Sequence, residues 1–117
     1  MTWKLAVVCA VVGLLGACSP APESYASGNA VVAALRAEGI ICTDYSAGEE
    51  AELLSDRGSC TSGEDAIDIY VFDDDADRDR WLAVGAGLSD VVIGPNWVVQ
   101  AAGQADEVAD ALGGDNP

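Results

Sequence analysis

Apolar residues after position 28 recur with two periods, one typical of helices and one typical of strands. Residues 29–38 carry an apolar stripe at helical spacing, which predicts a helix. Ser27 or Asn29 can cap its first turn, and Gly39 stands where a helix often ends. The stripe consists of Val31, Val32 and Leu35.

The strand patterns follow this helix. The clearest is residues 66–72, AIDIYVF, where every second side chain is apolar and would face one side of a sheet. Between the first two strands, residues 46–57 are expected to form a polar loop with one helical turn near Glu49–Leu54. The expected strands are residues 40–45, 58–62, 66–72 and two short ones within 91–101, around the turn Gly94-Pro95-Asn96.

Two further helices complete the pattern, at residues 73–85 and at residues 105–112 before Gly113. The resulting order is αβββαββα, and the chain of 117 residues has room for one core. We therefore expect a small single domain of the α+β class, with helices packed on one antiparallel or mixed sheet.

The first residues have a different character. Lys4 precedes an uncharged apolar run, residues 5–15, and the small residues Gly16 and Ala17 follow. This layout is typical of a secretory signal peptide, and the run is too short for a membrane span of about 20 residues. The next residue is Cys18.

Residues 15–18, LGAC, resemble the lipobox of bacterial lipoproteins. That resemblance implies that residues 1–17 are removed and that the Cys18 thiol carries a diacylglyceryl group, a lipid anchor with enough acyl chains for stable membrane attachment. The protein would then lie on the extracytoplasmic face of the cell membrane. Residues 18–28 read as the lipidated cysteine and a flexible linker, residues 29–113 as the domain, and residues 114–117 as a frayed tail.

The charge narrows the choice of partners. Removal of residues 1–17 takes away Lys4 and no acid, so the formal charge changes from −15 to −16. Such a domain is repelled by nucleic acid, so we expect none as a partner.

The cysteine usage is consistent with export, because Cys9 leaves with the signal peptide, Cys18 takes the lipid, and an even pair remains. We expect a Cys42–Cys60 disulfide, since two thiolates alone cannot complete a zinc site and their spacing differs from that of redox enzymes.

The domain also resembles a set of small uncharacterised actinobacterial lipoproteins with one cysteine pair. The stretches that carry this resemblance are GIICTDY, GSCTS, DRDRWLA and GPNWVVQA. It implies the architecture and the compartment, and it brings no activity with it.

Two features could carry binding chemistry. Asp73, Asp75 and Asp77 have the spacing of a calcium loop, but the glycine and glutamate of an EF-hand are missing, so we expect a helix cap instead. Trp81 and Trp97 are candidates for a partner-facing surface, although core packing of both is the expectation that their patterns favour.

The sequence has no histidine, and Lys4 is its only lysine. The mature chain therefore cannot form a Ser-His, Cys-His or Ser-Lys catalytic pair or a lysine Schiff base. We expect a non-catalytic protein without cofactor or metal, a binding or accessory module that engages another envelope protein. The alternatives are a structural or stress-related envelope protein without a discrete ligand, and a weak divalent-cation binder.

Overall fold

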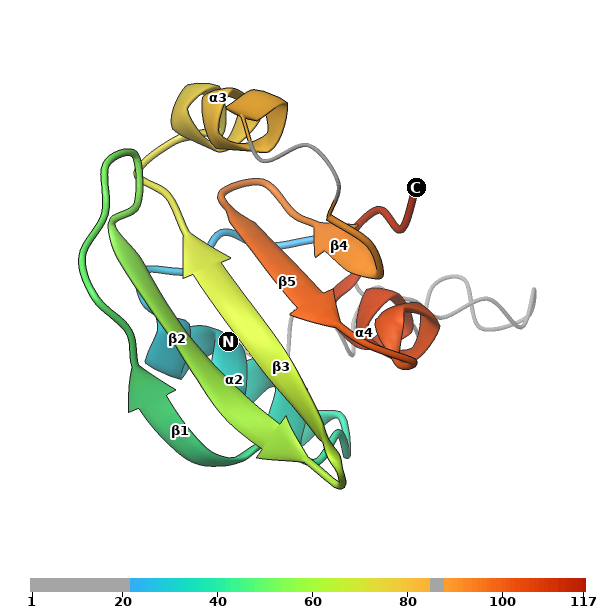
Figure 1. Cartoon of the computed structure of the whole chain (residues 1–117). Helices are drawn as coiled ribbons and strands as arrows, with labels where there is room; N and C mark the ends of the chain where they lie inside the picture. Colours follow the sequence, from blue (N-terminus) through green and yellow to red (C-terminus); the bar gives the residue numbers. More distant parts are fainter. Residues whose placement is uncertain (1–21, 85–87) are drawn as a thin grey trace.

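The computed structural model describes residues 22–84 and 88–117, which form three helices and one five-stranded sheet (Figure 1). The element order αβββαββα is as predicted. The helices are α2 (Gly28–Ala37), α3 (Asp75–Val84) and α4 (Ala105–Leu112). The strands are β1 (Thr43–Ala47), β2 (Asp56–Ser62), β3 (Asp65–Val71), β4 (Val91–Ile93) and β5 (Trp97–Ala101).

The sheet is antiparallel throughout, with the order β1-β2-β3-β5-β4. Strand β3 lies at its centre, and its residues Ile67, Ile69 and Val71 are fully buried on one face, as their alternation predicts. Residues that pair with them on β5 point to the same face. The sheet therefore has one apolar face and one more polar face.

Helices α2 and α4 cover the apolar face and contact each other as well as the sheet. In Figure 1, α2 lies behind strands β2 and β3. The third helix is outside this layer: α3 has no fully buried residue and stands at the end of the sheet where β3 ends and β5 begins (Figure 1). The expected layer of helices thus consists of α2 and α4.

The helix ends follow the signals in the sequence. The Ser27 side chain accepts a hydrogen bond from the Ala30 N–H at 3.2 Å, which makes Ser27 the cap of α2. Gly39 and Gly113 have φ values of 84° and 77°, the left-handed conformation that ends a helix and suits glycine. These positions confirm the predicted boundaries of α2 and α4.

Two local predictions between α2 and β2 are wrong. The first strand begins at Thr43, because Ile40 still donates its N–H to Leu35 O at 3.0 Å and closes the end of α2. The expected helical turn within the loop is a tighter turn, because Leu53 adopts a φ of 73°, which no right-handed helix accepts.

The two ends of the described domain are more ordered than the composition predicts. Residues 114–117 were expected to fray, yet Asp115 and Ile93 exchange two backbone hydrogen bonds of 2.7 and 2.8 Å. These bonds satisfy backbone groups at the edge of β4 that would otherwise lack a partner. At the other end, the flexible linker was expected to run to residue 28, but Glu23 and Tyr25 are already hydrogen-bonded to the domain. The linker prediction is therefore wrong for residues 23–28.

Candidate functional site

The predicted disulfide is present and buried. It joins Cys42, just before β1, to Cys60 in β2, with the two Cα atoms 5.2 Å apart. Only 1% and 3% of these residues is exposed. Cys18 and the predicted signal peptide lie outside the described residues.

Trp97 is not a partner-facing residue. Its side chain is fully buried under the helix layer, and its indole Nε1 donates a 2.7 Å hydrogen bond to the Glu23 carbonyl. It points inward because it occupies the same face of the sheet as Val99 and Ala101, which are also fully buried. The expectation of core packing is confirmed for Trp97, and its proposed role at the surface is wrong.

Trp81 is placed differently, because α3 carries it to the opposite face of the sheet. Its indole is half-buried and packs in tilted geometry against Tyr70, with ring centroids 4.5 Å apart, and against Phe72 at 5.6 Å. The Arg57 guanidinium also contacts Tyr70 and lies 5.4 Å from its ring centroid, within cation–π distance. Trp81, Tyr70 and Arg57 thus form a continuous row, which we call the aromatic row.

The aromatic row borders a shallow hollow of about 150 Å³ on the uncovered face of the sheet. Hydroxyl groups and one carboxylate share this hollow with Arg57 and Tyr70, and they come from Ser46, Ser59 and Asp68. Burial raises the pKa of the Tyr70 hydroxyl and the Asp68 carboxylate raises it further, while Arg57 opposes both effects. At neutral pH, Tyr70 is therefore a hydrogen-bond donor beside a positive charge.

Arg57 is the basic member of this surface. The ion pairs among residues 22–84 and 88–117 are Arg78–Asp79 at 2.8 Å and Arg80–Asp77 at 3.6 Å, and both are on α3. Arg57 forms no ion pair within the described part of the chain, although Asp68 lines the same hollow, and its guanidinium can bind a carboxylate of another molecule.

Sequence reasoning singled out Trp81 but missed Tyr70 and Arg57. Tyr70 occupies an outward position in the alternating strand β3, which was the available signal. Its contact with Arg57 depends on the antiparallel register that pairs the two residues, and that register is a tertiary feature.

The acidic run at residues 73–79 serves α3. Asp74 Oδ1 accepts a 2.9 Å hydrogen bond from the Asp77 N–H, which is the expected helix cap. Arg78 turns away from solvent and donates to the carbonyls of Gly94 and Pro95 at 2.7 and 2.9 Å. Within the described part of the chain, no three carboxylate or thiol groups come together at a metal-binding distance.

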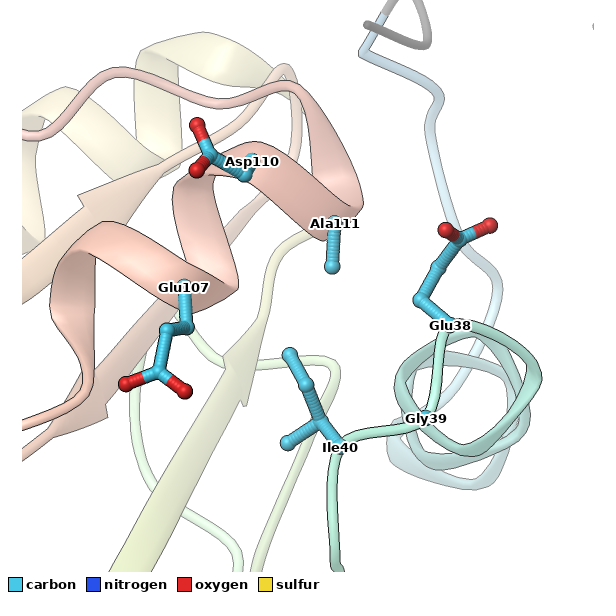
Figure 2. A pocket seen from close by; sticks show the side chains of 6 residues that line it. All are labelled: Glu38, Gly39, Ile40, Glu107, Asp110 and Ala111. Carbon is cyan, nitrogen blue, oxygen red and sulfur yellow. The ribbon is translucent and has the colours of Figure 1, made fainter.

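A second hollow, of about 310 Å³, opens between the end of α2 and α4 (Figure 2). Glu38, Glu107 and Asp110 line it, but their carboxylates point away from one another, and Ile40 and Ala111 lie between them (Figure 2). These carboxylates cannot share one ion in this arrangement. The aromatic row is therefore the stronger candidate for a binding surface.

Comparison with known proteins adds no relative: no family model matches the chain, and no curated protein or solved structure is significantly similar to it. Within residues 22–84 and 88–117, no helix is both long and apolar enough to cross a membrane.

Proposed function

We propose that this protein is a bacterial lipoprotein that is anchored through Cys18 to the extracytoplasmic face of the cell membrane. The apolar run of residues 5–15 and the LGAC motif support the anchor. The buried Cys42–Cys60 disulfide is consistent with export, because such bonds persist mainly in oxidising compartments.

At the membrane, the domain acts as a non-catalytic binding or accessory module for another envelope protein. The observation that carries this proposal is the aromatic row, because Trp, Tyr and Arg are the residue types that dominate binding energy in protein interfaces. The row lies on the sheet face that α2 and α4 leave uncovered. A half-buried Trp81 is held in place by Tyr70 and loses little conformational freedom when a partner covers it.

The chemistry of the row defines the matching surface on the partner. The two rings offer apolar contact area, and Arg57 offers a bidentate donor to a carboxylate. The remaining surface of the domain is strongly acidic and will steer it toward a partner with basic surroundings. Anchoring both proteins at one membrane raises their effective concentration, so a weak contact is sufficient.

The anchor is tested by growing cells with a labelled fatty acid. The wild-type protein should incorporate the label and sediment with membranes, whereas Cys18→Ala should do neither. Cys9→Ala is the matched control, since this cysteine precedes the cleavage position and its loss should leave labelling unchanged. Label that persists in Cys18→Ala, or is absent from the wild type, contradicts the anchor.

A further inference from the structure

The segment that follows Cys18 is fixed to the domain almost from its start. Asn96 holds Tyr25 by both backbone groups: its Oδ1 accepts from the Tyr25 N–H at 2.9 Å, and its Nδ2 donates to the Tyr25 carbonyl at 2.7 Å. The Trp97 indole Nε1 donates a 2.7 Å hydrogen bond to the carbonyl of Glu23, two residues before Tyr25. The Tyr25 and Trp97 rings also contact each other, with centroids 6.0 Å apart. We call residues 23–27 the docked segment.

The surface that receives the docked segment is itself well fixed. It is the β4–β5 turn, Gly94 to Asn96, whose first two carbonyls accept hydrogen bonds from Arg78 of α3. Asn96 also exchanges hydrogen bonds with the backbone of Phe72: it accepts from the Phe72 N–H at 2.8 Å and donates to the Phe72 carbonyl at 3.0 Å. The turn, the end of β3 and α3 therefore form one unit with the docked segment.

We propose that the docked segment holds the domain close to the lipid surface, with the β4–β5 turn as its membrane-facing end. This inference rests on the proposed anchor at Cys18. Five residue steps separate Cys18 from Glu23, and an extended chain covers about 17 Å over that number. A tether that stayed free as far as Gly28 would reach about 35 Å over ten steps and would leave the orientation open.

The position of the docked segment also indicates which kind of partner can bind the aromatic row. Tyr70 pairs with Val98, the residue after Trp97, so the row lies at the membrane-facing end of the sheet. The β2–β3 turn lies at the other end of β3, about 20 Å away along a strand of seven residues. The partner of the row is accordingly a membrane protein that presents its contact surface next to the lipid.

The test is energy transfer from tryptophan to lipid. The lipidated protein is reconstituted in zwitterionic vesicles that contain a dansyl headgroup lipid, since anionic headgroups would repel so acidic a domain. After removal of residues 1–17, the donors are Trp81 and Trp97, and both belong to the membrane-facing unit. We expect strong transfer in the wild type.

The key variant has 20 Gly and Ser residues inserted between Pro20 and Ala21, which lengthens the tether and leaves the domain intact. Such an insert adds a mean span of about 25 Å, so the transfer efficiency should fall at least about twofold. Asn96→Ala, which removes the contacts to Tyr25, should also lower the transfer, provided that circular dichroism shows a folded domain. Wild-type transfer as weak as that of the insertion variant would overturn the proposal.

Failure of the anchor gives a different result. In that case the purified protein lacks the mass of the lipid and does not float with the vesicles. A protein that is lipidated and bound to vesicles but shows weak transfer contradicts only the proposed position of the domain at the membrane. The two measurements therefore separate the lipid anchor from the orientation.

Discussion

Removal of the Cys42–Cys60 disulfide should destabilise the domain by about 3 kcal/mol. The two cysteines are 18 residues apart, and closing a loop of that length lowers the entropy of the unfolded chain by about 11 cal/mol/K. A domain of this size is stable by only about 5–10 kcal/mol, so the loss is a large part of the total. The loop contains β1, one of the two outer strands of the sheet, which should be the first element to open when the disulfide is removed.

The measurement is urea unfolding of the oxidised protein, the reduced protein and the double variant Cys42→Ala/Cys60→Ala, followed by tryptophan fluorescence. Reduction must be carried out in denaturant, because both cysteines are buried. The reduced protein and the double variant should unfold at lower urea concentration and with a steeper slope, since their unfolded chains are less compact. Thr61→Ala, at an exposed position beside Cys60, is the control and should change stability by less than about 0.5 kcal/mol. A loss below about 1 kcal/mol in both altered forms would refute the loop-closure argument.

Two further predictions concern packing and pH. Gly94→Ala places a methyl group against the buried Trp97 indole and should cost about 1–3 kcal/mol in thermal or urea unfolding, and an unchanged midpoint would contradict the packing of this turn. Burial raises the pKa of all three tyrosines above the ordinary value near 10, with nearby carboxylates adding to the effect. Because the folded state favours the protonated hydroxyl, the stability that these residues contribute is present below pH 10 and is lost as the pH rises through their folded-state pKa values. Tyrosinate absorbance should therefore appear at higher pH in the folded protein than in urea, and coincident titration curves would contradict the prediction; the residues are Tyr25, Tyr45 and Tyr70.

Local signals in the sequence predicted the elements and the apolar face of the sheet. The alternation of Ile67, Ile69 and Val71 sufficed to identify β3 and its buried side, because apolar side chains at every second position share one face in a strand but not in a helix. The two glycines at the helix ends were equally informative, since their backbone conformation is unfavourable for other residues. In each case the physical cause lies within a few residues of the signal.

The features that matter for function depend on contacts between distant residues. Residues 19–28 have the composition of a free linker, and the docking of residues 23–27 depends on the Asn96 side chain, 71 residues beyond Tyr25. Arg57 meets Tyr70 only because a specific antiparallel register joins β2 and β3. The alternation of Trp97 with Val99 and Ala101 predicted that it is buried. The position of Trp81 at the uncovered face depends on where α3 packs against the sheet, and the local pattern around Trp81 did not predict it.

Cross-linking in intact cells tests most directly the proposal that the aromatic row binds another envelope protein. Carbodiimide suits this protein, because the sequence after residue 17 is rich in carboxylates and has no lysine of its own to react with them. The cross-linked protein is recovered from the membrane fraction, and its adducts are identified by mass spectrometry. The matched variants are Arg57→Glu, which reverses the charge in the row, and Arg80→Glu, which reverses a charge on the exposed side of α3.

We predict one dominant adduct in the wild type and in Arg80→Glu, and its loss in Arg57→Glu. The absence of any specific adduct, or an adduct that all three proteins form equally, would contradict the account and would favour an envelope protein without a discrete ligand.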